Sequence, residues 1–210
     1  AGNHFIFQTL CEAIIRTPRD EIGMVIAAWS QANRDDWQIY KDAFKDRMMY
    51  NETYLKGFVW HNDRLNKNGD VFSWVRSDVI RMITLQKLCE SLNINYKQFS
   101  MVSLFDGYIS GLVKTEDEIQ KINEKQTGED LRHKYPGDKK KDYMKCCEIL
   151  LEYEDYINKD NFIGWPMVNK LGGNNFSSRI EDKKYQIGKY DPHPNKLGHE
   201  KIAKEIYESF

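Results

Sequence analysis

Residues 191–199 read Asp-Pro-His-Pro-Asn-Lys-Leu-Gly-His and lead directly into an amphipathic segment at the end of the chain. Two prolines flank His193 and fix the backbone angle φ on both sides of it, and Pro192 also disfavours helical geometry at Asp191. The apolar residues that follow share one face of a helix at spacing four: Ile202, Ile206 and Phe210. We therefore expect a stiff, non-helical loop that feeds a closing helix beginning near residue 196.

Asp191 and His193 are two residues apart and can act as a pair. A carboxylate beside an imidazole fixes its tautomer and stabilises the imidazolium, while the other ring nitrogen serves as a general base. The plainer interpretation is a helix-capping loop, in which Asn195 caps the closing helix and His193 lies on the surface. A metal site that adds His199 to this pair is disfavoured, because the helix-borne spacing His-x-x-x-His is absent.

The whole pattern Asp-x-His-Pro-Asn-x-x-Gly-His, followed by an Ile-Ala helix, resembles the closing block of the SGNH (GDSL-type) hydrolases. In that family the block supplies the Asp and His of the catalytic triad just before the last helix. The commoner block has one more residue between Asp and His, and this sequence is similar to the shorter variant of phage-encoded relatives. The resemblance implies a flavodoxin-like three-layer α/β/α sandwich with a central parallel sheet, catalytic roles for Asp191 and His193, and one domain over residues 1–210.

The N-terminal residues predict a helix followed by a buried strand. Residues 4–16 carry apolar side chains at helical spacing behind Asn3, which is a favourable capping residue. Residues 23–29 form a continuous apolar run, as expected for a central strand of a parallel sheet. Polar side chains follow the end of this run, where ligands bind in open α/β sheets: Ser30, Gln31 and Asn33.

The resemblance gives these polar residues roles in binding a substrate and its oxyanion, the negatively charged oxygen of an acyl-transfer intermediate. Either Gln31 or Asn33 supplies the side-chain amide in place of the family's Gly-x-Asn-Asp block. Gly2 and Asn3 match the block whose glycine N–H and asparagine face the same oxygen. N–H groups at a helix N-terminus suit a developing negative charge on electrostatic grounds alone. The plainer alternatives are an ordinary cap at Asn3 and an ordinary loop after the strand.

The remainder of the chain continues the alternation of helices and strands. The patterns predict helices over 71–92 and 142–157, and strands over 99–105 and 162–167. Residues 107–141 are polar and charged, which indicates an inserted excursion within about 107–160. Residues 35–70 are dense in aromatic and charged side chains without a sustained period. They indicate short helices and loops over the active-site end, with half-buried packing favoured over a sugar-stacking rim.

The nucleophile of the family is missing from this sequence. SGNH enzymes carry it in a Gly-Asp-Ser block after the first strand, and no Gly-Asp-Ser occurs in these 210 residues. Ser103 and Ser110 do not lie in a Gly-x-Ser-x-Gly elbow. Because the sequence opens at Ala1 already within the resemblance, we expect an N-terminally truncated, phage-like esterase domain whose nucleophile lies upstream. The alternative is a non-catalytic carbohydrate-binding or virion structural module that keeps the fold.

Charge and cysteine usage narrow the class of protein. The chain carries 31 Lys plus Arg against 32 Asp plus Glu, so it lacks the basic field that holds nucleic acid. No Cys-x-x-Cys pair occurs, and scattered cysteines in apolar segments are typical of reduced core thiols in an intracellular protein: Cys11, Cys89, Cys146 and Cys147. No apolar run reaches membrane-spanning length. We expect a soluble protein of the host cytoplasm or the virion, without cofactor or metal, that acts on a small ester or acylated carbohydrate.

Overall fold

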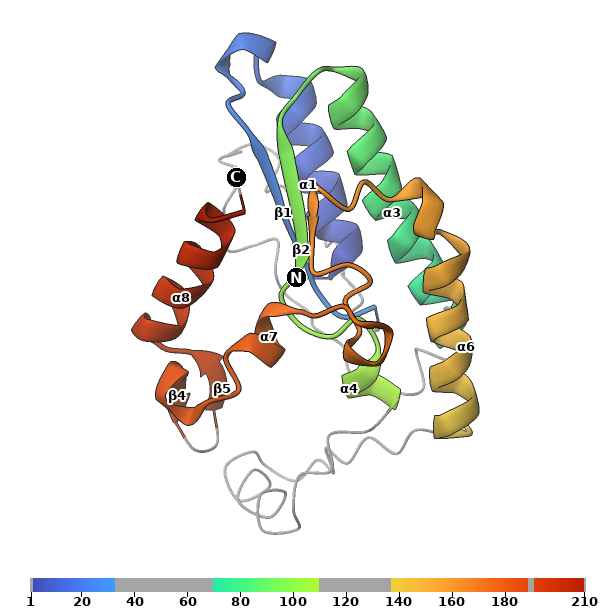
Figure 1. Cartoon of the computed structure of the whole chain (residues 1–210). Coiled ribbons are helices and arrows are strands. Elements are labelled where there is room, and N and C mark those ends of the chain that lie inside the picture. The colour runs from blue at the N-terminus through green and yellow to red at the C-terminus, as the bar shows by residue number, and fades with distance from the viewer. Residues whose placement is uncertain (1, 33–69, 110–136, 189–190, 210) are drawn as a thin grey trace, which may run out of the picture.

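The computed structural model describes residues 2–32, 70–109, 137–188 and 191–209 (Figure 1). Its helices and strands, in chain order, are α1 (Asn3–Arg16), β1 (Val25–Trp29), α3 (Val71–Ser91), β2 (Tyr96–Ser100), α4 (Asp106–Ile109), α6 (Lys139–Glu152), β3 (Phe162–Ile163), α7 (Phe176–Arg179), β4 (Gln186–Gly188), β5 (Asp191–Pro194) and α8 (Lys196–Tyr207). Short 3-10 turns lie at Arg19–Glu21, Glu154–Tyr156, Asn169–Leu171 and Lys183–Tyr185. The predictions for Asn33, for the aromatic segment up to residue 69 and for residues 110–136 of the excursion lie outside the described residues.

Among the described residues, three parallel strands form the main sheet in the order β1-β2-β3. β1 and β2 pair along their whole lengths, with Ala27 opposite Gln98, and β3 adds a short pairing in which Phe99 lies opposite Ile163. Parallel neighbours require crossover connections, and α3 and α6 lie in the chain between the successive strands. The predicted mixed α/β class with a parallel sheet is therefore confirmed.

One face of the sheet packs with α1, α3 and α6 in the larger core. Side chains alternate along a strand, and the residues of β1 on this face are buried: Val25, Ala27 and Trp29. The apolar stripe of α3 joins them through Val75 and Val79, which are completely buried. The Trp29 indole Nε1 donates to Gln98 Oε1 at 3.0 Å, so the indole N–H is paired inside the core.

Three of the four cysteines belong to this core. Cys89, Cys146 and Cys147 are buried, Cys11 is partly buried, and all four are free thiols. Burial raises the pKa of Cys89 to about 11 and that of Cys146 to about 12, so both thiols are neutral near neutral pH. The prediction of core thiols is confirmed for the three buried residues.

The opposite face of the sheet packs with α7 and α8 in a smaller core. Phe99 of β2 meets Phe176 of α7 edge to face, with ring centroids 4.7 Å apart. Ile202 of α8 is buried in the same cluster, and Ile206 packs partly against it. The predicted closing helix is therefore confirmed, because it begins at Lys196 and lays its apolar face on the sheet.

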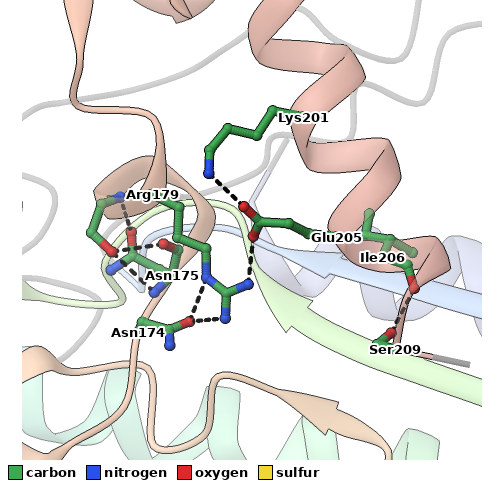
Figure 2. A network of polar contacts seen from close by, with 8 residues as sticks. Asn174, Asn175, Arg179, Lys201, Glu205, Ile206 and Ser209 are labelled. Carbon is green, nitrogen blue, oxygen red and sulfur yellow. Dashed lines mark hydrogen bonds and ion pairs between the residues drawn. The ribbon is translucent and has the colours of Figure 1, made fainter.

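A polar network fastens α8 to the turn that carries α7 (Figure 2). Arg179 donates from Nη1 to Glu205 Oε2 at 2.6 Å and from Nε to Asn174 Oδ1 at 2.8 Å. Lys201 Nζ donates to the other oxygen of Glu205 at 2.6 Å. Burial alone raises the pKa of Glu205, but the hydrogen bonds from Lys201 and Arg179 outweigh it and hold that pKa below its ordinary value.

We expect Glu205→Gln to lower the free energy of unfolding by about 1–2 kcal/mol near neutral pH, because it removes the negative partner of two cations. The lowered pKa means that this stabilisation is present above the unfolded-state pKa and is lost as the pH falls through the folded-state value. Urea unfolding near neutral pH and at about pH 3 measures the difference. Glu208→Gln is the matched control, since Glu208 is the exposed C-cap of the same helix and its Oε1 lies 3.6 Å from Lys204 Nζ. Equal losses for both variants, or a loss independent of pH, would contradict the expectation.

The boundaries predicted for the first helix and second strand are wrong in their details. Gly2 is the N-cap of α1, and Asn3 is already inside the helix with its side chain buried, so Asn3 does not cap it. β2 ends at Ser100 instead of running over 99–105. Met101 N donates the last hydrogen bond to β1, at Trp29 O, and the chain then turns, with the Ser100 hydroxyl donating to Val102 O.

Local hydrogen bonds and backbone angles also explain the later differences. α6 begins at Lys139, before the predicted residue 142, because Asp138 accepts from the next amides and caps the helix. β3 stops at Ile163, because Gly164 adopts a left-handed φ of 83°. The expected loop around His193 is the strand β5, paired antiparallel with β4. Prolines are tolerated there because the pair is a two-stranded sheet with open edges among the described residues.

Candidate functional site

The carboxyl ends of β1 and β2 lie at one end of the sheet, where α1 also begins (Figure 1). We refer to four residues gathered there as the strand-end cluster: Gly2, Asn3, Ser30 and Gln31. Ala32 N donates to Leu104 O at 2.8 Å and ties the loop after β1 to the loop after β2. This end of an open parallel sheet is the usual place for a ligand, so the cluster is the candidate site.

Asn3 and Ser30 are joined by reciprocal hydrogen bonds. Asn3 Nδ2 donates to Ser30 O at 3.0 Å, and Ser30 N donates to Asn3 Oδ1 at 2.6 Å. Asn3 is 2% exposed and Ser30 is 6% exposed, so both partners are shielded from water. A side chain that occupies both backbone groups of one residue holds that residue in a fixed orientation. The start of α1 therefore fixes the exit of β1.

A buried carboxylate of α3 completes this arrangement. Asp78 Oδ2 accepts from Asn3 Nδ2 at 2.6 Å, and Asp78 Oδ1 accepts from Arg81 Nη1 one helical turn further on. Asp78 is 2% exposed, while the side chain of Arg81 is 28% exposed. The sequence predictions did not include either residue. The sequence did contain one signal for Asp78, because it is a charged residue among the apolar positions of α3, directly before Val79.

These contacts decide what the Asn3 amide can do. Its Nδ2 group donates to both Ser30 and Asp78, and its Oδ1 accepts from Ser30, so both donor hydrogens and the oxygen are engaged. Donation to an oxyanion requires one of these bonds to break. The geometry therefore favours a positioning role for Asn3, in which it holds Ser30. A role as a direct oxyanion donor is less favoured. Gly2 is buried as the N-cap of α1, directly beside it.

Gln31 lies against α4. A Cβ atom added at Gly107 would stand 2.9 Å from Gln31 Nε2, so the missing side chain leaves room for the amide. Gln31 Oε1 and Ser30 Oγ are buried, and neither has a hydrogen-bond partner among the described residues. Unpaired buried polar atoms cost about 1–3 kcal/mol each, and a bound ligand or water is one explanation for them. Their position after β1 agrees with a substrate-binding role for Ser30 and Gln31.

His193 lies apart from this cluster on the β4–β5 hairpin. Its side chain is exposed, and Asp191 is the first residue of the same strand. Figure 1 shows the hairpin toward the same end of the molecule as the carboxyl ends of β1 and β2. Asp191 and His193 thus lie on strand β5. The hydrogen bonds of Asn3 and Ser30 link α1, the end of β1 and α3, and they do not reach His193.

The Asn-x-x-Gly part of the C-terminal pattern holds this hairpin to α8. Asn195 Nδ2 donates to Lys184 O at 2.8 Å and to Gln186 O at 2.9 Å, and Asn195 Oδ1 accepts from Gly198 N at 3.0 Å. Asn195 N also donates to Tyr185 O at 2.8 Å. Asn195 therefore caps the closing helix and His193 is exposed, as in the plainer interpretation of this loop. The same side chain also fixes the backbone of the strand opposite His193, which the sequence pattern did not reveal.

Comparisons of the chain with protein-family models, with curated proteins and with solved structures find no significant match. The likeness to SGNH hydrolases is therefore carried by the sequence motifs alone. Within the described ranges, no helix combines the length and the apolar character needed to cross a bilayer.

Proposed function

We propose that the chain is part of an SGNH-type esterase with a flavodoxin-like α/β/α sandwich, and that the nucleophilic serine lies in a segment outside these 210 residues. The substrate class is a carboxylic ester, such as an O-acetyl group on a polysaccharide. The observation that carries the proposal is the reciprocal pairing of Asn3 with Ser30, which brings two blocks of the motif together at the carboxyl end of a parallel strand.

The proposed chemistry assigns one proton route. His193 takes the proton of the attacking serine hydroxyl and passes it to the leaving alcohol, and an acyl-enzyme forms. Water then attacks this intermediate with the same histidine as base. Asp191 orients His193, while Gly2 and Gln31 donate hydrogen bonds to the oxyanion. Asn3 holds Ser30, and hence the start of the Gln31 loop, because its own amide is already engaged.

A second candidate is a non-catalytic module that binds carbohydrate or forms part of a virion. The observation in its favour is the lack of a Gly-Asp-Ser block anywhere in the 210 residues. Such a module keeps the fold and the strand-end cluster without the chemistry. Because such a module catalyses no reaction, it does not require His193 as a catalytic base.

Hydrolysis of p-nitrophenyl acetate and butyrate distinguishes the two candidates. The 210-residue chain should show no serine-dependent turnover, because its sequence contains no Gly-Asp-Ser block. A protein that also contains the upstream segment should hydrolyse both esters. Robust turnover by the 210 residues that disappears in Ser30→Ala or Ser103→Ala would refute the assignment of the nucleophile. An inactive longer protein that still binds acetylated sugars would favour the binding module.

A further inference from the structure

Asp78 is a charged residue on the buried face of α3, which is apolar except for Asp78 and Gln86. Its neighbours on that face, Val75, Val79 and Met82, are completely buried in the larger core, and Asp78 itself is 2% exposed. Removing a carboxylate from water is costly unless it is paired and hydrogen-bonded, and a buried ion pair is seldom worth more to stability than apolar residues of the same size. The stability of α3 therefore does not account for a carboxylate at this position.

The two oxygens of Asp78 have different partners. Arg81 donates to Oδ1, while Oδ2 accepts from Asn3 Nδ2 at 2.6 Å. An ionised carboxylate only accepts hydrogen bonds, so it requires the NH2 group of the Asn3 amide to face α3. The amide oxygen then faces Ser30 and accepts its N–H at 2.6 Å. The charge of Asp78 thus determines which of its two orientations the Asn3 amide adopts.

We propose that Asp78, neutralised by Arg81, is a positioning residue that sets the orientation of Asn3 and, through it, the backbone of Ser30 at the exit of β1. Both backbone groups of Ser30 are held by this one amide, so the orientation passes directly to the residue that precedes Gln31.

The catalytic part of this inference rests on the proposed function, because a fixed Ser30–Gln31 segment matters when Gln31 must meet a developing oxyanion. Hydrogen-bond donors stabilise a transition state best when they are oriented before the charge appears. Asp78 bonds to Asn3, and Asn3 bonds to Ser30, so Asp78 acts on Ser30 through Asn3. The structural part, the control of Ser30 by Asp78, can be measured whether or not the protein is an esterase.

The test is the hydrogen-exchange rate of the Ser30 amide, followed by NMR in the 210-residue chain. Asp78→Asn should raise it by about tenfold, because the asparagine no longer fixes the Asn3 amide in one orientation. Asn3→Ala should raise it at least as much, and Asp78→Asn should add nothing in the Asn3→Ala background, since the two residues act in series. Glu90→Gln is the matched control, because Glu90 lies on the same helix and pairs with Lys87 at 2.8 Å, far along α3 from Asn3. It should leave Ser30 unchanged.

Unchanged exchange at Ser30 in Asp78→Asn, or independent effects of the two substitutions, would overturn the inference. If Asp78→Asn does not fold, Arg81→Ala is the second variant, because it keeps the carboxylate but removes its cation. A several-fold rise in the exchange rate of the Ser30 amide supports the inference, and an unchanged rate overturns it. In the longer protein, Asp78→Asn should lower kcat for p-nitrophenyl acetate with little change in KM. A longer protein without turnover would reject the esterase proposal and leave the exchange result to decide the role of Asp78.

Discussion

His193→Ala should lower kcat by about three orders of magnitude or more in a protein that carries both this chain and the upstream nucleophile, with the fold intact. The reason is the loss of the general base together with the activation of the serine. His193 lies in β5 between two prolines, where its backbone is fixed before substrate arrives. Steady-state kinetics and the thermal midpoint, measured side by side, separate loss of chemistry from loss of fold.

His199 is the internal control for this prediction. It lies in the first turns of α8, is exposed, and its N–H donates to Asn195 O at 2.9 Å as part of the helix. His199→Ala should therefore cost far less in kcat, with any effect appearing as stability. Asp191→Asn should be intermediate, because the short Asp-x-His spacing allows another group to orient the imidazole. If His199→Ala abolishes turnover and His193→Ala leaves it near wild type, the catalytic assignment is wrong.

Gly198→Ala should lower the free energy of unfolding by about 2–3 kcal/mol. Gly198 is buried at the start of α8, and a Cβ there would stand 2.5 Å from Tyr185 O and 2.9 Å from Pro194 Cβ. The first of these is a backbone atom in the segment that Asn195 fastens, so the hairpin must move away from the helix. Urea unfolding measures the loss, and faster amide exchange in the β4–β5 hairpin should accompany it.

Gly188→Ala is the matched control for this substitution. Gly188 ends β4 in the same hairpin, and a Cβ there would meet nothing within 4 Å. It should change the free energy of unfolding by less than about 0.5 kcal/mol. Similar losses for the two variants would show that the close approach of α8 to the hairpin does not stabilise the protein.

The elements that sequence reasoning located well are those with a long, simple apolar pattern. The helix predicted over 71–92 is α3 almost residue for residue, and the run over 23–29 contains β1. Both are decided by burial of many apolar side chains, which a periodic pattern reports directly. The three-residue strand β4 was not predicted, because its pairing with β5 depends on tertiary contacts with Asn195 instead of on its own residues.

The candidate site was predicted less completely than the fold. The motif and the topology of parallel sheets predict that Asn3, Ser30 and His193 converge at one edge of the sheet, and the structure joins Asn3 to Ser30 by hydrogen bonds that do not reach His193. An asparagine at a helix start has the same sequence signature whether it caps the helix or turns into the core. Its actual partner, Asp78, is 75 residues away in the chain. No local pattern links the two, so only the fold reveals that the Asn3 amide is occupied and acts on Ser30.

The central claim is that this chain holds the base and the oxyanion side of a serine-hydrolase site whose nucleophile lies outside its 210 residues. Mass spectrometry after reaction with a fluorophosphonate tests it most directly, because only an activated serine is modified. The account predicts no adduct on the 210-residue chain, and a single adduct on an upstream serine of the longer protein that forms far more slowly in His193→Ala. An adduct on Ser30 or Ser103, or an unlabelled longer protein, would contradict it.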